Sequence, residues 1–357
     1  MQFILYTTGR CNLSCKYCGG SFDPSIVPWR VEYRIGLLDD LIKSGDVVAF
    51  YGGEPLLNIA FMKDVVERFP DARFVVQTNG LLLDRLSPRL LDSLSTILIS
   101  IDGREAVTDM YRGKGVYRKV LNSVSAVRAK GFEGELVARM TLTCHSDVFS
   151  DVMHLLDIGI FDSVHWQLSF VWVPIESWPD LWQWIRESYM TGLRRLFGEW
   201  LARLERGELL GIVPFRGILK RVLRGGPIPP CGSGIESFTI LTDGRVVSCP
   251  IAVSERWAFV GRLGNVSRSD IEKRKPIVEE PCNSCERLRT CGTRCLYTHL
   301  ERLWGIEGVK AVCECSKFII DLIENNLERI MSATSRSRLR LEDLLYPEYN
   351  NTVEIMP

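Results

Sequence analysis

Short apolar runs alternate with amphipathic stretches through the first half of this 357-residue chain. Apolar runs of four to eight residues predict strands, and apolar positions at helical spacing predict helices. Strands that alternate with helices indicate βαβ units, and therefore a parallel sheet that is open or closed into a barrel. The predicted strands cover residues 3–8, 47–51, 73–77, 96–101, 135–143 and 163–170, and the predicted helices cover 33–44, 58–69, 87–94, 116–130 and 147–157.

Polar motifs stand at the ends of the first four predicted strands. Any one of them could be an ordinary turn, because Gly and Asn favour turn geometry. In β/α barrels, however, active sites are built at the carboxyl ends of the strands, so four such motifs in succession predict a site. In chain order they are Cys11-x3-Cys15-x2-Cys18, Gly52-Gly53-Glu54-Pro55, Gln77-Thr78-Asn79-Gly80 and Ser100-Ile101-Asp102-Gly103.

The fifth and sixth predicted strands each have one polar face. Side chains alternate between the two faces of a strand, and fully buried parallel strands are usually apolar on both. The polar faces therefore predict a barrel lumen that holds a polar ligand, although an exposed sheet face would give the same pattern. The residues concerned are Arg139, Thr141 and Thr143 on the fifth strand and His165, Gln167 and Ser169 on the sixth.

The rest of the chain has a different character. A helix-rich stretch covers about 177–224, and the Gly- and Pro-rich segment 225–230 predicts a domain boundary. Beyond it lie eight of the twelve cysteines, all between residues 231 and 315. We expect a barrel domain over 1–224 that includes the helical stretch as a connector, a small cysteine-rich domain with a terminal helix over 231–331, and a tail over 332–357.

Composition narrows the classes of function. Lys plus Arg and Asp plus Glu both number 44, so nothing indicates a nucleic-acid partner. The N-terminus has no charged segment followed by a signal-peptide pattern, and no apolar run reaches the 18 residues of a membrane span. We therefore expect a cytoplasmic protein without membrane contact. In a reducing compartment, twelve cysteines favour metal binding over disulfides.

The first cysteine group has three members rather than four. Closed structural sites use four ligands, whereas three cysteines leave one iron of a four-iron cluster without a thiolate. The alternative from the residues alone is a zinc knuckle that takes a distant fourth ligand. Cys11, Cys15 and Cys18 are the candidate ligands, and Tyr17 precedes the last of them.

With the Gly-Gly-Glu-Pro segment, this cysteine loop resembles the radical S-adenosylmethionine superfamily. The resemblance implies a partial (β/α)6 TIM-like barrel, a [4Fe–4S] cluster on the three cysteines, and S-adenosylmethionine bound to the open iron. Reductive cleavage would then give a 5′-deoxyadenosyl radical that abstracts hydrogen from a substrate. By family position, Gly52, Gly53 and Glu54 would hold the methionyl amine, and Asn79 and Ser100 would lie near the cofactor. On the polar strand face, Arg139 is the candidate partner of the methionyl carboxylate.

The second cysteine group has the spacing Cys-x2-Cys-x5-Cys-x3-Cys, flanked by further cysteines. A zinc ribbon could use two such pairs, but the full set resembles the SPASM domain, which implies two auxiliary [4Fe–4S] clusters. By position, cluster I would use Cys231, Cys249 and Cys295, and its fourth corner would be open, take a ligand other than cysteine, or use Cys315. Cluster II would use Cys282, Cys285, Cys291 and Cys313. Cys144 is expected to be a small buried side chain. The Asp243-Gly244 pair predicts a hairpin turn between Cys231 and Cys249.

The barrel-plus-SPASM layout resembles enzymes that act on peptides or proteins. Sulfatase-maturing members have an Asp after the cysteine equivalent to Cys249, where this chain has Pro250, so the resemblance does not extend to that activity. The expected partners are a peptide or protein substrate, an electron donor such as flavodoxin or ferredoxin, and a separate protein that binds a leader peptide. The alternatives are a radical dehydrogenase of a small molecule and, outside enzymes, a zinc-binding interaction protein.

Overall fold

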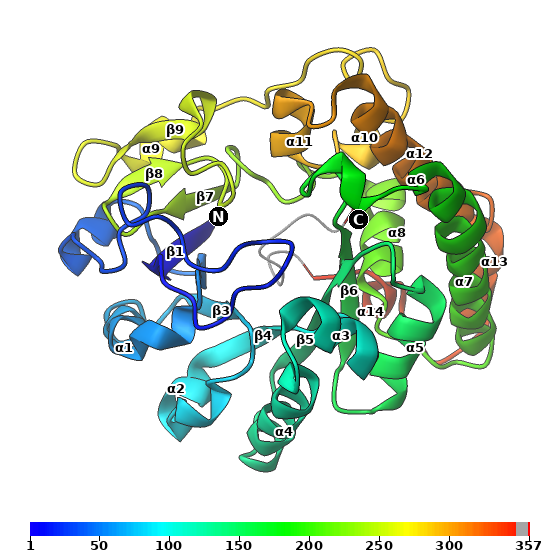
Figure 1. Cartoon of the computed structure of the whole chain (residues 1–357), viewed down its shortest axis with the longest axis horizontal. Helices are drawn as coiled ribbons and strands as arrows, with labels where there is room; N and C mark the ends of the chain where they lie inside the picture. The colour runs from blue at the N-terminus through cyan, green and yellow to red at the C-terminus, as the bar shows by residue number, and fades with distance from the viewer. Residues whose placement is uncertain (348–355) are drawn as a thin grey trace.

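The computed structural model describes residues 1–347 and 356–357, and it confirms an α/β fold with a parallel sheet of partial-barrel type. Figure 1 shows the sheet curving around a central space, with helices on its outer face. The strand order is β6-β5-β4-β3-β2-β1-β7-β8-β9, and neighbours from β6 to β7 are parallel. The strands are β1 (Gln2–Thr8), β2 (Val47–Gly52), β3 (Arg73–Thr78), β4 (Leu94–Ser100), β5 (Glu135–Leu142), β6 (Ser163–Leu168), β7 (Ser237–Ile240), β8 (Arg245–Val247) and β9 (Phe259–Arg262).

Alternate residues of each barrel strand pack in different places. On β1, Phe3 and Leu5 join the large core beneath the outer helices, whereas Ile4 belongs to a smaller cluster with Ala49 and Leu98 on the opposite face. This period of two buries both faces of the sheet, as expected when helices cover one face and the barrel interior the other. Every residue of β1 is buried for that reason.

The helices follow the predicted pattern with two differences. The segment predicted as a helix over 33–44 forms only a 3-10 helix, η1 (Ile35–Asp40), and an additional helix, α3, follows β4. A π-helix, η5 (Trp184–Tyr189), continues into α7. The α-helices are α1 (Ile59–Arg68), α2 (Pro88–Ser93), α3 (Glu105–Arg112), α4 (Val116–Ala129), α5 (Val148–Asp157), α6 (Leu181–Gln183), α7 (Met190–Glu205), α8 (Val213–Arg224), α9 (Arg268–Glu272), α10 (Leu288–Cys291), α11 (Leu296–Glu301), α12 (Gly305–Glu324), α13 (Leu327–Arg336) and α14 (Leu341–Leu344).

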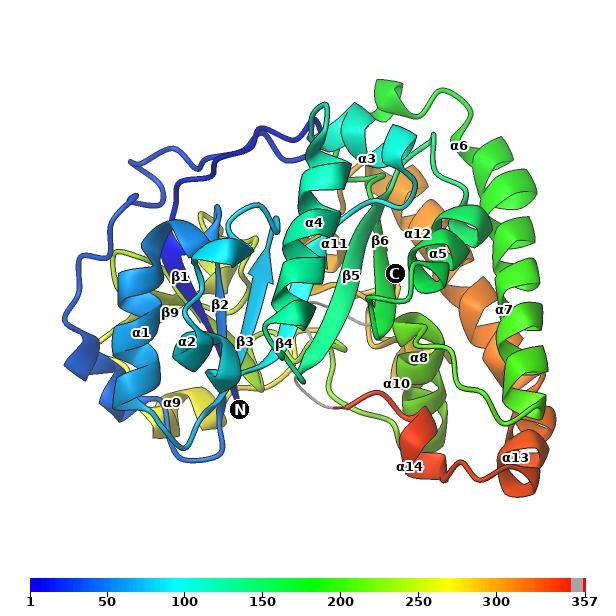
Figure 2. The ribbon, with the colours of Figure 1, turned by 90° about the horizontal axis from the view of Figure 1, so that it is seen from below.

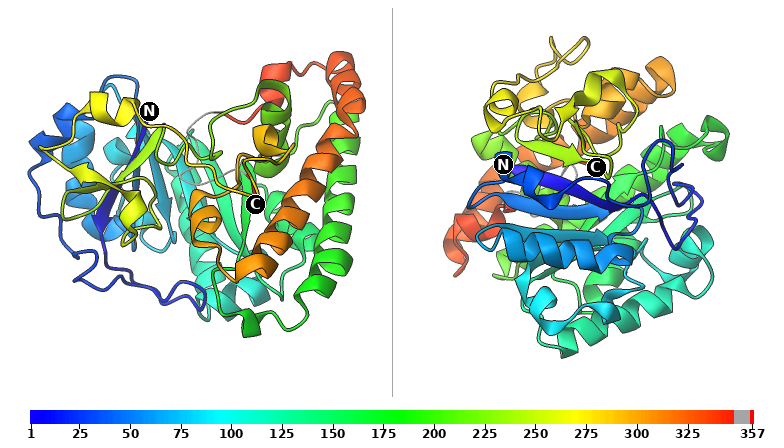
Figure 3. Two further views of the ribbon diagram at one scale, coloured as in Figure 1. Left: turned by 90° about the horizontal axis from the view of Figure 1, so that it is seen from above. Right: turned by 90° about the vertical axis from the view of Figure 1, so that its left-hand side faces the viewer.

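The sheet continues across the predicted boundary at 225–230. Strand β7 pairs parallel with β1, and the predicted Asp243-Gly244 turn joins it to the antiparallel strand β8. The segment that carries α10, α11 and α12 then lies over the side of the barrel between β1 and β6 (Figures 1 and 3). Helix α12 buries Ile319 and Ile323 in the same core as Leu196 of α7. The cysteine-rich segment and the barrel thus share one sheet and one core.

The two ends of the barrel differ. Figure 2 shows the long segment after β1 together with α3 at one end, and α14 at the other. At the α14 end, the buried Tyr346 packs against the interior face of the sheet, and its ring lies 5.6 Å from the Arg216 guanidinium. The tail predicted over 332–357 thus contains part of α13 and all of α14, and its residues 348–355 lie outside the described part. No helix among the described residues has the length and apolar character needed to cross a membrane.

Candidate radical chemistry site

The loop that carries the first three cysteines is held directly against the end of β2. Backbone amides of Gly53 and Glu54 donate to the carbonyls of Thr8 and Arg10, at 3.0 and 2.8 Å. A Cβ atom on Gly53 would lie 2.3 Å from the Arg10 oxygen and 2.9 Å from the Cys11 nitrogen. Glycine is required here because any side chain would push the cysteine loop away from β2.

The three thiols converge on the same space. A hydrogen bond between the Cys15 and Cys18 thiols raises the pKa of Cys15 and lowers the pKa of Cys18. Burial raises the pKa of the Cys11 thiol, which is close enough to Cys18 and Glu54 for their charges to add to the shift. All three line one cavity. The loop therefore gathers three potential thiolates at the carboxyl end of β1.

A buried ion pair fixes the middle of the cysteine loop. Asp102, directly after β4, accepts two hydrogen bonds of 2.8 Å from Arg112 at the end of α3, and a third of 2.7 Å from the Tyr17 hydroxyl. The Arg112 guanidinium also lies 5.4 Å from the centre of the Tyr17 ring. Burial alone would lower the pKa of Arg112, but the Asp102 carboxylate outweighs it and raises that pKa. The sequence motif indicated Asp102 as part of a turn, but nothing in the sequence linked it to Arg112.

Glu54 is fully buried between β2 and β3. Its carboxylate accepts hydrogen bonds from the backbone amides of Leu56 (3.0 Å) and Asn79 (2.7 Å), and from the Thr78 hydroxyl (2.7 Å). Burial raises the pKa of Glu54 to about 7, against these three donors. A carboxylate with spare acceptor capacity in such a site favours a cationic group as its next partner.

These residues line a cavity of about 420 Å³, within the usual range for a small-molecule site. Every barrel strand contributes to it from its carboxyl end. Asn79, Ser100 and Arg139 line it, and the Asn79 side-chain amide donates to Asn12 Oδ1 at 2.7 Å, which ties β3 to the cysteine loop.

The predicted polar faces of β5 and β6 contribute to this cavity in part. Arg139, Thr141, Gln167 and Ser169 line it, whereas Thr143 and His165 do not. Tyr6 and Trp172 also line it. The sequence pattern did not single them out, because Tyr6 belongs to an apolar strand and Trp172 to the loop after β6.

Part of the chain matches a known protein family. Residues 5–156 match the model of the radical SAM superfamily. This part of the chain, less than half of its length, is similar to a radical SAM domain. A [4Fe–4S] cluster and S-adenosylmethionine are the cofactors that such a domain implies. The residues present fit them, because three thiols leave a fourth position open and glycine backbone lines the adjoining cavity.

The curated relatives match only part of the chain. The chain is 31% identical over 124 residues to an uncharacterized protein of Methanocaldococcus jannaschii, and 34% identical over 130 residues to the probable GTP 3',8-cyclase of Methanocella arvoryzae. The alignments cover 31% and 35% of this chain, and only 41% and 42% of the two relatives.

The solved structures extend the likeness to nearly the whole fold. Native anSMEcpe with bound AdoMet has a TM-score of 0.67 at 18% identity, covering 94% of this chain and 99% of that one. The same protein has been solved with a Cp18Cys peptide. Streptococcus suis SuiB bound to its precursor peptide SuiA has a TM-score of 0.51 at 14% identity, covering 82% of this chain and 70% of that one. At these identities the likeness establishes the fold.

Four cysteines outside residues 5–156 gather where α12 passes the 279–291 segment. Cys282 and Cys313 line one small cavity. Burial raises the pKa of the Cys291 thiol to about 12, and the nearby charges of Cys313 and Cys282 raise it further. Burial also raises the pKa of Cys313, and the nearby Cys285 adds to that shift. Arg287 holds the segment to α12 through Asp321, at 2.7 Å. The set predicted for auxiliary cluster II is thus brought together.

The segments of the cysteines predicted for auxiliary cluster I also meet. A Cβ atom on Gly234, three residues after Cys231, would lie 3.1 Å from Ser248 and 4.0 Å from Leu296. These neighbours directly adjoin Cys249 and Cys295, both of which are buried. Cys315 is buried in the main core on α12. In the described part of the chain, no three His, Cys, Asp or Glu side chains close around a single metal ion.

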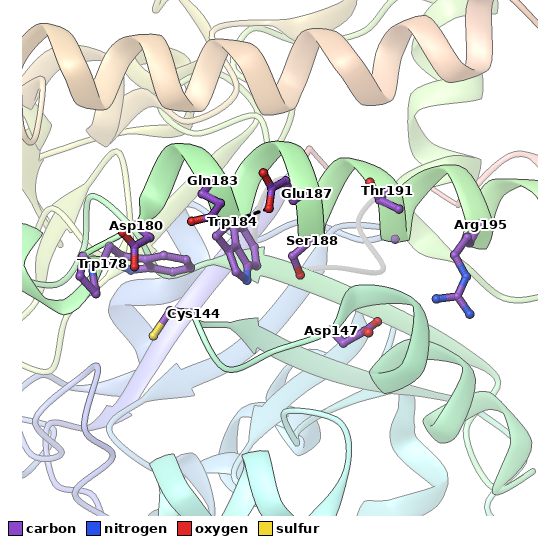
Figure 4. A pocket seen from close by; sticks show the side chains of 12 residues that line it. Cys144, Asp147, Trp178, Asp180, Gln183, Trp184, Glu187, Ser188, Thr191 and Arg195 are labelled. Atoms are coloured by element: carbon purple, nitrogen blue, oxygen red, sulfur yellow. Dashed lines mark hydrogen bonds between the residues drawn. The ribbon is translucent and has the colours of Figure 1, made fainter.

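A second hollow, of about 570 Å³, lies beside the β5–α5 loop (Figure 4). Trp178, Trp184 and Glu187 line one wall, and Cys144 and Asp147 the other. Cys144 is half-buried rather than fully buried, and its sulfur lies 3.3 Å from Nδ1 of His145. Its sulfur also lies 4.0 Å from the Tyr111 hydroxyl, and the Tyr111 ring stacks on Tyr17 of the first cysteine loop.

Proposed function

We propose that this chain is a radical SAM enzyme that modifies a peptide or protein and carries two auxiliary clusters. One observation carries the first part: three convergent thiols and the Gly52–Glu54 backbone border the same 420 Å³ cavity at the carboxyl ends of the strands. No ordinary structural site leaves such a cavity open beside its ligands.

The chain's own residues would hold and orient the cofactor. Glu54 supplies a buried negative charge for the methionyl amine, and Arg139 a positive charge for the carboxylate, both from the cavity wall. Asn79 and Ser100 add polar contacts from β3 and β4. When bound, the cluster and S-adenosylmethionine supply reductive cleavage and hydrogen abstraction from the substrate. Gln167, Ser169 and Trp172 also line the cavity, and a substrate would contact the protein there.

A peptide substrate is supported by the fold neighbours and by the grouping of the remaining cysteines. Both anSMEcpe and SuiB have been solved with a peptide, and both resemble this chain beyond the radical SAM domain. The auxiliary clusters would take Cys231, Cys249 and Cys295 in one case, and Cys282, Cys285, Cys291 and Cys313 in the other. A reduced flavodoxin or ferredoxin would supply electrons, and a separate protein would present any leader peptide.

A small-molecule substrate is the second candidate. Its support is the 34% identity over 130 residues to the probable GTP 3',8-cyclase. A short peptide encoded beside the gene, and converted by the enzyme to a product of altered mass, would favour the first candidate. Turnover of a nucleotide or sugar without any peptide would favour the second.

Anaerobic reconstitution tests the proposal as a whole. We expect about twelve irons and twelve sulfides per chain, a reduced paramagnetic signal that changes on addition of S-adenosylmethionine, and release of 5′-deoxyadenosine. Replacing Cys11, Cys15 and Cys18 together by Ala should remove four irons and all 5′-deoxyadenosine. Bound zinc without iron would refute the proposal in favour of a zinc-binding protein.

A further inference from the structure

The second hollow, of about 570 Å³, is bordered by the same two segments as the cavity of the candidate site. Along β5 and the loop after it, Thr141 lines the cavity and Cys144 lines the second hollow. Along the segment after β6, Trp172 lines the cavity and Trp178 lines the second hollow. Three residues of chain span at most about 11 Å, so the two spaces adjoin. A peptide that leaves the cavity between the ends of β5 and β6 would therefore reach the second hollow within a few residues.

One wall of the second hollow is aromatic and held in place from behind. The rings of Trp178 and Trp184 meet with their centres 4.8 Å apart, and Tyr189 stacks on Trp184 at 5.3 Å. Trp178 is 4% exposed and belongs to the main core, and Trp184 packs against that core while remaining partly exposed. The wall thus offers a fixed apolar surface to an extended side chain.

Three carboxylates line the same hollow, and in the described chain no Lys or Arg forms an ion pair with any of them: Asp147, Asp180 and Glu187. Arg104, whose charge reaches Asp147, is already paired with Asp151 at 2.7 Å. Arg195 also lines the hollow, but Figure 4 shows it at the end away from Trp178. Its guanidinium lies over the Phe149 ring, 4.0 Å from the ring centre. The part of the hollow beside the tryptophans therefore has an excess of negative charge.

Two of these carboxylates have no evident task in holding the fold. The Asp147 carboxylate accepts the Ser150 amide at 2.9 Å and so caps α5. Asp180, in contrast, precedes α6 without capping it, and Figure 4 shows it beside Trp178. Glu187 accepts only a side-chain amide one turn earlier on its own helix, from Gln183 at 2.9 Å. Both Asp180 and Glu187 are exposed, so an external cation can approach them.

We propose that the second hollow binds a Lys or Arg side chain of the peptide substrate, a few residues from the position that the enzyme modifies. The inference rests on the proposed function, because it takes the substrate to be a peptide. Lys and Arg have an apolar stem and a cationic tip. The stem packs on the two tryptophans while the tip pairs with Asp180 and Glu187. Complementary charges of this kind fix the register of a partner, so the hollow selects which residue of the peptide enters the cavity.

The test measures binding of labelled peptides to the full-length reconstituted chain, without turnover. The probe is a fluorescein-labelled heptapeptide with two lysines, compared with the same peptide carrying two glutamines, and fluorescence anisotropy gives both dissociation constants. The double variant Asp180→Asn with Glu187→Gln removes two charges from the hollow. The matched control is Glu133→Gln with Asp157→Asn, two exposed carboxylates that lie outside the hollow, before β5 and at the end of α5. Alkylation of Cys144 by iodoacetamide, followed by mass spectrometry, reports whether the hollow itself is occupied.

We expect the lysine peptide to bind about three- to tenfold more tightly than the glutamine peptide, with the difference shrinking as salt is added. The variant in the hollow should lose most of that difference and the control should keep it, and the lysine peptide should slow the alkylation of Cys144. Equal affinities of the two peptides, equal losses in the two double variants, or unslowed alkylation would overturn the inference. Displacement by an equal concentration of spermidine would also overturn it, in favour of a general cation site. Binding as expected without release of 5′-deoxyadenosine would uphold the peptide site and reject the radical chemistry of the proposed function.

Discussion

At the scale of single residues, the candidate site depends on one glycine and one carboxylate that adjoin each other. Gly53 lets the cysteine loop approach the end of β2, and Glu54 uses the next position to reach across to β3. The two residues perform different tasks, one steric and one electrostatic, so their substitutions should have separable effects.

Gly53→Ala should loosen the cysteine loop, because its Cβ would lie 2.3 Å from the backbone oxygen of Arg10. We expect the free energy of unfolding to fall by about 1–3 kcal/mol and the iron bound by the first cluster to decrease. Urea unfolding and iron counting measure the two effects. The control is Gly198→Ala in α7, where a Cβ meets nothing within 4 Å, so that stability should stay level or rise.

Affinity for S-adenosylmethionine should depend on pH through Glu54, whose pKa burial raises to about 7. The ammonium group of the ligand needs the ionised carboxylate, so affinity should fall about tenfold per pH unit below 7 and level off above it. Glu54→Gln should bind about 10–100-fold more weakly above pH 7, with little dependence on pH. Calorimetric titration of reconstituted protein between pH 5.5 and 8.5 distinguishes the two profiles; equal slopes would exclude Glu54 as the titrating group.

At the scale of secondary structure, α3 is the element that secures the cysteine loop from the far side. Its last residue, Arg112, reaches Asp102 at the end of β4, and both contact Tyr17 in the loop. The helix thus joins two strand ends that are separated by much of the barrel rim.

Asp102→Asn should destabilise the whole domain, because it leaves a buried guanidinium without its counter-charge. The Asp102 side chain is 0% exposed and that of Arg112 is 7% exposed. We expect a loss of about 3–5 kcal/mol in urea unfolding. In Glu105→Gln, which breaks the exposed pair between Glu105 of α3 and Arg118 of α4, the change should stay within about 0.5 kcal/mol. Similar losses in both variants would contradict a special role for the buried pair.

At the scale of the whole molecule, the cysteine-rich segment completes the barrel rather than hanging from it. Strand β7 pairs with β1 over four residue pairs, and the Tyr6 hydroxyl donates to the Pro250 carbonyl at 2.6 Å. The first barrel strand therefore has neighbours on both sides only when both segments are present.

A chain that ends at residue 230 should fail to stay monomeric. Removal of β7 exposes the edge of β1, a strand whose residues are all buried in the full chain, and unpaired apolar edges promote association. Size-exclusion chromatography should find aggregates for residues 1–230 and a defined species for the full chain. A monomeric, cooperatively unfolding fragment would establish the barrel as an independent domain.

Much of this organisation could be predicted from local patterns. The strands were found because short apolar runs alternate with amphipathic stretches, and the Asp243-Gly244 turn because its geometry favours those residue types. The segment 33–44 was predicted as a helix but forms only η1, because Gly36 within it lowers the helix propensity, and α3 was missed because its eight residues span little more than two turns. Short elements are decided by tertiary contacts rather than by propensity.

The sequence by itself determined the order of strands and helices, the three-cysteine loop, and the position of polar groups at strand ends, because each depends on neighbours in the chain. Only the tertiary structure decided that Asp102 meets Arg112 and Tyr17, that β7 extends the barrel sheet, and that the segments after β5 and β6 border a second hollow beside the cavity. These contacts join residues far apart in sequence, and the chain must close on itself before burial and charge can act between them.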